Sequence, residues 1–124
     1  MKDIKILIID DEESWVVSMR MLISRKLGIR EVISCTDSRR AVDIIDQQSI
    51  SGILLDYNMP HLDGMRLLQV IRQKKPDIPV IMLSGQGFEE MAVMEEHREA
   101  DGYVDKSAGT EDILSEIKKR FTFE

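Results

Sequence analysis

LLDYNMPHLDGM, residues 54–65, joins a short apolar run to a turn and then to a new helical pattern. An apolar run that ends on Asp56 is unusual, because a strand buried on both faces normally finishes in apolar or neutral turn residues. Met59-Pro60 marks the turn, and Asp63-Gly64 leads into the helical segment that follows. Asp56 therefore stands where a buried strand meets solvent, and its carboxylate needs either a partner or a chemical role.

The length and composition indicate one globular domain spanning residues 1–124. Of the 124 residues, 43% are hydrophobic and 32% are charged, as in ordinary folded domains. No apolar run approaches the ~20 residues of a membrane-spanning helix, and the N-terminus shows no signal-peptide cleavage site. The single cysteine, Cys35, cannot form an internal disulfide, which suits a reducing compartment. We therefore expect a cytoplasmic protein with no membrane partner.

The charge balance bears on the choice of partner. Lysine and arginine together number 17, and aspartate and glutamate 23, which gives a formal net charge of −6. This excess of acid disfavours direct contact with nucleic acid, whose backbone attracts basic proteins. A cation or a basic partner is the better expectation.

Apolar blocks alternate with amphipathic blocks along the chain. The apolar blocks have the length and composition of strands, and their near-continuous hydrophobicity indicates burial on both faces, as in a parallel sheet. They cover residues 4–9, 31–35, 53–55, 79–83 and 103–104. Because a helical segment follows each strand, the order predicts an α/β doubly wound three-layer sandwich with a five-stranded parallel sheet and five helices.

Four of the intervening segments have clear helical spacing of their apolar residues, namely residues 15–23, 41–45, 65–72 and 113–121. The expected caps are Gly28 at the end of the first helix, Asp37 or Ser38 before the second, Asp63 before the third and Thr110 before the last. The fourth helix in chain order, residues 87–100, is the weakest prediction. Its apolar residues crowd one end, and the other end is almost entirely charged.

Polar side chains stand where the predicted strands end. Asp10 and Asp11 follow the first strand, Asp56 the third, Ser84 the fourth and Lys106 the fifth. In an open parallel sheet, ligands bind outside the carboxyl ends of the strands, where the strand order reverses. We therefore expect these five side chains to meet in one cleft.

The chemistry of this set favours a divalent cation and a phosphate substrate. Three carboxylates in one cleft repel one another, and a hard cation removes this cost by taking their oxygens as ligands. Mg²⁺ is the natural candidate, because a few carboxylates hold it and phosphate oxygens complete its coordination. A carboxylate can also act as the nucleophile and form an aspartyl phosphate, with Lys106 and Ser84 contacting the arriving phosphoryl group.

Four stretches, KILIIDDEES, LLDYNMPHLDGM, VIMLSGQG and ADGYVDKSA, together resemble the receiver domain of two-component response regulators, of the chemotaxis-regulator type. The resemblance covers essentially the whole chain. It implies a flavodoxin-like sheet of order 2-1-3-4-5. It also implies a phosphoacceptor switch with autocatalytic phosphorylation and dephosphorylation, rather than an enzyme.

The resemblance assigns roles to individual residues. Asp56 would accept a phosphoryl group from the phosphohistidine of a sensor histidine kinase or phosphotransfer protein. Asp11, Asp56 and the main-chain carbonyl of Asn58 would bind Mg²⁺, or alternatively Mn²⁺, with Asp10 acting largely through water. Lys106 and Ser84 would contact the phosphoryl group.

The resemblance also implies how the signal leaves the site. The hydroxyl of Ser84 would move to the phosphate and the ring of Tyr103 would follow inward. The surface of the fourth helix, fifth strand and fifth helix would then control a downstream effector protein or domain, and phosphorylation could produce a homodimer. The sequence departs from the family at Ser107, where proline is usual after the lysine, often across a cis bond. A cis bond without proline costs ~2.5–4 kcal/mol, so a trans bond in an altered loop and a strained cis bond are both open.

Other interpretations of the same residues stay open at this level. Asp11 could simply cap the first helix, Trp15 is expected in the core rather than at a ligand, and Gly64 is expected to supply backbone freedom. The acidic residues 10–12 would repel a pyrophosphate, which argues against a nucleotide-binding enzyme. The main alternative function is a docking module of the same fold that binds its partner independently of phosphorylation. With 124 residues, the chain is either a single-domain regulator or a receiver cut from a longer one.

Overall fold

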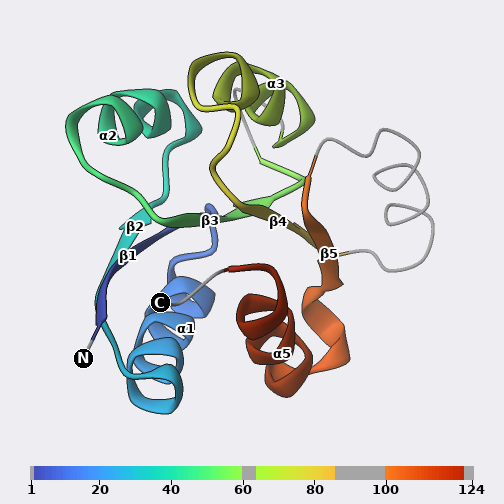
Figure 1. Ribbon diagram of the computed structural model, residues 1–124. Helices are drawn as coiled ribbons and strands as arrows, with labels where there is room; N and C mark the ends of the chain where they lie inside the picture. Colours follow the sequence, from blue (N-terminus) through green and yellow to red (C-terminus); the bar gives the residue numbers. More distant parts are fainter. Residues whose placement is uncertain (1, 60–63, 86–99, 122–124) are drawn as a thin grey trace.

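Five apolar segments of the chain form one parallel sheet with the strand order β2-β1-β3-β4-β5 (Figure 1). The strands are β1 (Lys2–Ile9), β2 (Ile29–Cys35), β3 (Gly52–Asp56), β4 (Val80–Ser84) and β5 (Gly102–Asp105). The computed structural model describes residues 2–59, 64–85 and 100–121. The predicted parallel sheet and its strand order are confirmed.

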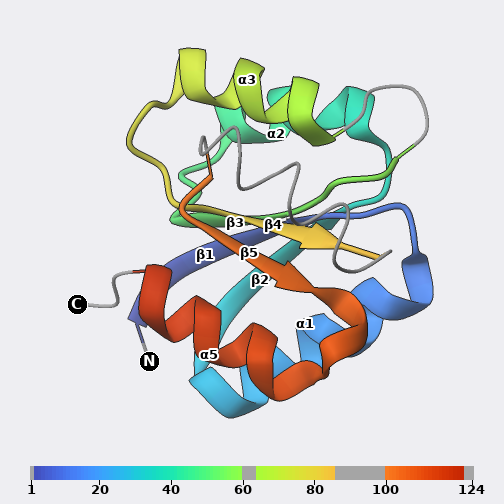
Figure 2. The same cartoon turned by 90° about the vertical axis from the view of Figure 1, so that its right-hand side faces the viewer.

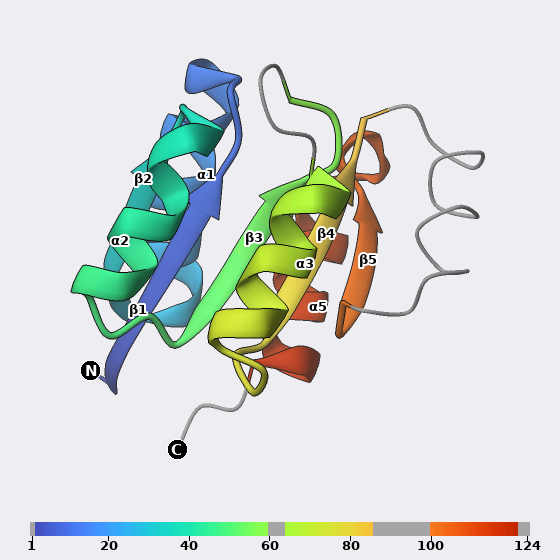
Figure 3. The same cartoon turned by 90° about the horizontal axis from the view of Figure 1, so that it is seen from above.

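Helices cover both faces of the sheet (Figure 2). On one face lie α1 (Glu13–Leu27) and α5 (Thr110–Arg120), and on the other lie α2 (Ala41–Gln47) and α3 (Gly64–Lys74). Seen from above, α2 lies over β1 and β2, and α3 lies over β3 and β4 (Figure 3). Two 3₁₀ turns, η1 (Ser38–Arg40) and η2 (Lys106–Ala108), precede α2 and α5. The predicted fourth helix and the predicted Asp63 cap fall outside the described residues, apart from residue 100.

The sheet separates two apolar cores, because successive side chains of a strand point to opposite faces. In β1, Ile6 and Ile8 belong to the core under α1 and α5, whereas Leu7 and Ile9 belong to the core under α2 and α3. Every residue of β3 and β4 is buried, as expected for central strands covered on both faces. Among the described helices, none is long and apolar enough to cross a membrane.

The ends of α1 agree only partly with the sequence interpretation. Gly28 is the C-cap, as predicted, with a φ of 67° in the left-handed region that glycine adopts without steric cost. Its N–H donates to the carbonyl of Ser24. At the other end the N-cap is Glu12, which makes no side-chain capping bond. The alternative in which Asp11 serves as the cap of this helix is therefore wrong.

Two other caps can be compared with their predictions. Asp37 caps η1 by accepting a hydrogen bond from the main-chain N–H of Arg39. The N-cap of α2 itself is Arg40, so the predicted Asp37 or Ser38 cap of this helix is wrong, because a 3₁₀ turn precedes it. The N-cap of α5 is Gly109, and Thr110 is already the first helical residue. The predicted Thr110 cap is therefore wrong by one position. The cap has a φ of 118°, a conformation that side-chain-bearing residues rarely adopt.

The end of α5 packs beneath the start of β3. A Cβ atom on Gly52 would lie 2.7 Å from ring carbons of Phe121, closer than real side-chain contacts allow. The absence of a side chain at Gly52 therefore gives the Phe121 ring, which is 3% exposed, its place in the core beneath α1 and α5.

Candidate functional site

The predicted site residues come from strand ends that lie level with one another. Asp56 and Ser84 are the last residues of β3 and β4, Asp10 directly follows β1, and Lys106 directly follows β5. The strand register pairs Asp56 with Leu83 of β4 and pairs Ser84 with the last residue of β5. Parallel pairing thus brings side chains from four separate parts of the sequence to one edge of the sheet.

Asp10, Asp11 and Asp56 form an acid cluster at this edge. One carboxylate oxygen from each residue lies within 4.8 Å of the other two. Asp10 is fully buried and Asp56 is 3% exposed, whereas Asp11 is exposed to solvent. A purely oxygen donor set with one open side suits a hard divalent cation that keeps several waters, as Mg²⁺ does.

Burial makes the negative charge of this cluster costly. Burial, and next the neighbouring Asp10 carboxylate, raise the pKa of Asp56 from its usual value of 3.8 to about 7, against the opposing effect of Lys106. Burial also raises the pKa of Asp10, although the hydrogen bond from Lys106 lowers it in part. Without a metal ion, two carboxylates share a site of low polarity, and a bound cation would relieve their repulsion.

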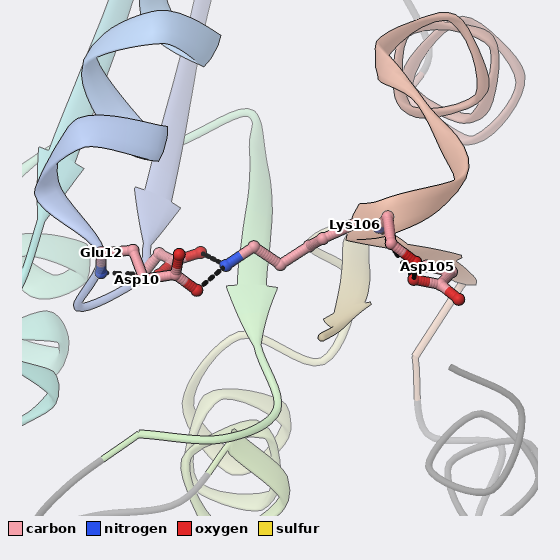
Figure 4. Close-up of polar contacts among 5 residues, drawn as sticks. Asp10, Glu12, Asp105 and Lys106 are labelled. Carbon is pink, nitrogen blue, oxygen red and sulfur yellow. Dashed lines mark hydrogen bonds and ion pairs between the residues drawn. The ribbon is translucent and has the colours of Figure 1, made fainter. Parts of the chain in front are cut away.

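Lys106 reaches from η2 across to the start of α1 (Figure 4). Its Nζ donates to Oδ2 of Asp10 at 2.7 Å and to Oε1 of Glu12 at 2.7 Å. The same nitrogen lies 4.6 Å from the ring centroid of Trp15, within the range of a cation–π contact. Burial lowers the pKa of Lys106, but the hydrogen bonds to Asp10 and Glu12 outweigh this and raise it. The ammonium therefore stays charged at neutral pH.

Glu12 and Trp15 are site residues that the sequence interpretation missed. Trp15 packs partly buried against the core under α1 and α5, as expected, but its ring also contacts the Lys106 ammonium. The main-chain N–H of Glu12 donates to Oδ1 of Asp10 at 2.9 Å, which fixes the turn between β1 and α1. The three-residue spacing of Glu12 and Trp15 places both on one side of a helix start. This spacing is the feature of the sequence that could have indicated that the two side chains lie together.

The turn that carries Lys106 is held by its two neighbours. Oδ1 of Asp105 accepts hydrogen bonds from the main-chain N–H of Ser107 at 2.8 Å and from its hydroxyl at 2.6 Å. These bonds lower the pKa of the Asp105 carboxyl. Figure 4 shows Asp105 pointing away from the Lys106 side chain. The described peptide bonds, including Lys106–Ser107, are all trans, which settles the alternative left open by the missing proline.

Gly64 allows the start of α3 to approach the main chain of Asp56. A Cβ atom on Gly64 would overlap the Asp56 carbonyl oxygen and lie 2.7 Å from the Cα of Tyr57. The Gly64 N–H donates to the carbonyl of Tyr57 at 2.9 Å. Gly64 is the first residue of α3, and the position requires space for the main chain of Asp56 and Tyr57. That Gly64 also supplies backbone freedom stays a prediction.

Comparison with known protein families gives the same assignment as the sequence motifs. The family profile described as the response regulator receiver domain matches residues 6–118. The chain belongs to this receiver domain family. Receiver domains are regulatory parts of two-component systems, which confirms the resemblance drawn from the sequence motifs.

Individual relatives give the extent of the likeness. This receiver domain is 32% identical to a putative NtrX-like response regulator of Rickettsia typhi. The match covers 96% of the present chain and 25% of the relative. It is 30% identical to the nitrate/nitrite response regulator protein NarL of Escherichia coli, over 90% of its own length and 52% of the relative. The chain thus spans between about a quarter and a half of the curated relatives that it matches.

Solved structures agree on the fold. A response regulator receiver domain protein from Clostridium thermocellum is 29% identical, with a TM-score of 0.80 over 94% of this chain and 92% of that one. A CheY-like receiver domain protein from Methanospirillum hungatei is 26% identical, with a TM-score of 0.83 over 94% of this chain and 91% of that one. The flavodoxin-like architecture predicted for this receiver domain is confirmed.

The remaining predicted residues of the receiver domain lie near the strand ends. Asn58 is exposed, two positions beyond Asp56. Ser84 is fully buried, and Tyr103 is partly buried against the core under α2 and α3. The register pairs Met82 with Tyr103 in neighbouring strands, so Ser84, two residues beyond Met82, faces the same side of the sheet as Tyr103. The roles of Asn58, Ser84 and Tyr103 stay predictions.

Proposed function

We propose that this receiver domain is a phosphoryl-accepting signalling switch in which Asp56 is the acceptor. The donor is the phosphohistidine of a sensor histidine kinase or of a phosphotransfer protein. The observation that carries the proposal is the placement of the nearly buried Asp56 carboxylate within 4.8 Å of Asp10 and Asp11, at the sheet edge that Lys106 also reaches. Family membership supports the same regulatory role.

The chain supplies each element that phosphoryl transfer to a carboxylate needs. An oxygen of Asp56 attacks phosphorus, the bond from phosphorus to the donor imidazole breaks, and the imidazole leaves with the bonding electrons. Mg²⁺, or alternatively Mn²⁺, held by Asp11, Asp56 and the Asn58 carbonyl and by Asp10 largely through water, would neutralise charge on the transferring group. Lys106 would donate an N–H to one phosphoryl oxygen, and Ser84 would donate its hydroxyl to another.

Phosphorylation would then act as an electrostatic switch. It adds about −1.5 to −2 units of charge and three acceptor oxygens at Asp56. Ser84 would follow these oxygens, and the Tyr103 ring beside it would settle inward, which favours one of two conformations of the surrounding surface. The output surface is formed by the predicted fourth helix, β5 and α5, and it controls an effector protein or domain or a second copy of the chain.

The decisive experiment is phosphorylation with acetyl phosphate and Mg²⁺, followed by intact-mass spectrometry. The wild type is expected to gain one phosphoryl group, and Asp56→Asn none. Asp43→Asn, which alters an exposed acid of α2, is the matched control and should label like the wild type. Equal labelling of Asp56→Asn and wild type would refute Asp56 as the acceptor. A wild type that binds Mg²⁺ but is never labelled would favour the alternative of a phosphorylation-independent docking module.

A further inference from the structure

We infer that Glu12 is a positioning residue of this site, because its carboxylate competes with the phosphoryl group on Asp56 for the ammonium of Lys106. By holding Lys106 in the unphosphorylated protein, Glu12 slows the phosphorylation of Asp56. The inference rests on the proposed function, since it takes Asp56 as the acceptor. It concerns the rate at which Asp56 is phosphorylated, and it assigns an effect on this rate to Glu12.

Lys106 already contacts two carboxylates and an aromatic ring before any phosphoryl group arrives. An ammonium has three N–H donors, and two of them go to Asp10 and Glu12 at 2.7 Å each. The Trp15 ring, at 4.6 Å, occupies a further side of the same nitrogen. Among the described residues, Lys106 makes no hydrogen bond or ion pair with Asp56. The two carboxylates therefore compete with an arriving phosphoryl group for the position of the ammonium, and movement of Lys106 towards Asp56 would weaken one of these contacts.

Glu12 is the contact that yields at least cost. The Asp10 side chain has no exposed surface, so its release would leave an unpaired carboxylate in a buried site. Trp15 is anchored in the core under α1 and α5. The Glu12 side chain is 61% exposed, and water can solvate its carboxylate as soon as Lys106 leaves. The phosphoryl group therefore displaces Glu12 and leaves the Asp10 contact in place.

Two effects of Glu12 must be separated experimentally. Its carboxylate holds Lys106, and it also adds negative charge near an anionic phosphodonor. Glu13 is the matched control, because it is the next residue, is exposed, and makes no hydrogen bond or ion pair with Lys106 within the part of the chain that the structure describes. Glu12→Gln and Glu13→Gln remove the same charge, but only Glu12→Gln loosens Lys106.

The test compares the rate of phosphorylation by acetyl phosphate in saturating Mg²⁺ for the wild type and both variants. We expect Glu12→Gln to be phosphorylated about twofold to fivefold faster than Glu13→Gln, which corresponds to the loss of one partly exposed ion pair. In the Lys106→Met background, the two substitutions should have equal effects, because the competition acts through Lys106. Two results would overturn the inference: equal rates for Glu12→Gln and Glu13→Gln when Lys106 is present, or a faster rate for Glu12→Gln that persists in the Lys106→Met background.

A second readout needs neither a phosphodonor nor a Lys106 variant. Trp15 is the only tryptophan in the chain, so intrinsic fluorescence reports on the ring that faces the Lys106 ammonium. Glu12→Gln is expected to change the emission and Glu13→Gln to leave it unchanged. Identical spectra would count against the contact. If the wild type shows no labelling that depends on Asp56, the proposed function fails; if labelling is intact and the two variants agree, only the role of Glu12 fails.

Discussion

Lys106 and Asp10, which lie 96 residues apart in the sequence, form an ion pair of 2.7 Å whose side chains are 7% and 0% exposed. Removing the lysine leaves a buried carboxylate unpaired beside Asp56, so we expect Lys106→Met to lower the free energy of unfolding by about 3 kcal/mol at neutral pH. Mg²⁺ should restore part of this loss, because it also neutralises the carboxylates. Urea denaturation with and without Mg²⁺ measures both effects.

The control for this variant is Lys74→Met. Lys74 pairs with Asp46 at 3.3 Å, but the two side chains are nearly half exposed, at 46% and 44%. Its removal should cost less than about 1 kcal/mol, as is usual for surface ion pairs. Similar losses for the two variants would contradict the structural importance assigned to the buried pair.

The metal-free protein should lose stability through Asp56 as the pH rises. Burial, and next Asp10, raise the pKa of Asp56 to about 7 from a usual value of 3.8. Between these values the folded state holds the proton of Asp56 more tightly than the unfolded state does. The stability that this protonation gives the folded state is therefore fully present below about pH 4 and is lost as the pH rises to about 7. Asp56→Asn should therefore be more stable than the wild type at pH 8, with the difference shrinking towards pH 4. Urea denaturation across this range tests the trend, and a constant difference would contradict it.

Mg²⁺ is expected to raise the melting temperature of the wild type. At a concentration ten times the dissociation constant, one bound ion adds about 1.4 kcal/mol to the free energy of unfolding. Asp11→Ala removes the exposed oxygen of the acid cluster and should respond far less. Glu13→Ala, which alters an exposed acid outside the cluster, should respond like the wild type. Thermal shifts of equal size in all three proteins would argue against a metal ion at Asp11.

Gly64→Ala tests the close approach between α3 and the main chain of Asp56. The added methyl group would overlap the Asp56 carbonyl oxygen, and we expect a loss of about 1–3 kcal/mol of stability, as for other overpacked sites. Phosphorylation should also slow, because the strain falls on the residue that we propose as acceptor. Gly85→Ala is the control, since a Cβ there meets nothing within 4 Å among the residues that the structure describes. A neutral Gly64→Ala would contradict the assigned role.

The fold could be predicted because its central strands are buried on both faces. A residue in such a strand cannot be polar without a partner, so β3 and β4 had to appear as unbroken apolar runs that end on Asp56 and Ser84. The meeting of Asp10 with Asp56 followed from the same rule, because parallel strands end at one edge. Helix starts were less predictable, since the α5 cap depends on the positive φ of Gly109 rather than on the hydroxyl of Thr110.

The sequence placed Glu12 and Trp15 on one side of a helix start but could not show that Lys106 contacts them. The pairing of Lys106 with Glu12 joins residues 94 positions apart, and no periodicity relates them. The contact depends on the short turn η2, on the Asp105 side chain that holds this turn, and on the direction in which Trp15 leaves α1. Each of these is a choice of side-chain rotamer or local backbone that packing decides.

Gly52 and Asp56 are the first and last residues of β3, and the two ends of this strand have different roles. The role of Gly52 is steric, because the Phe121 ring occupies the space that a side chain at Gly52 would need. The role of Asp56 is ionic. The stability of the domain can therefore be altered at the Gly52 end of β3, at the opposite end of the strand from the carboxylate that we propose as the phosphoryl acceptor. Substitutions at Phe121 are expected to change the free energy of unfolding more than the phosphorylation that we propose at Asp56.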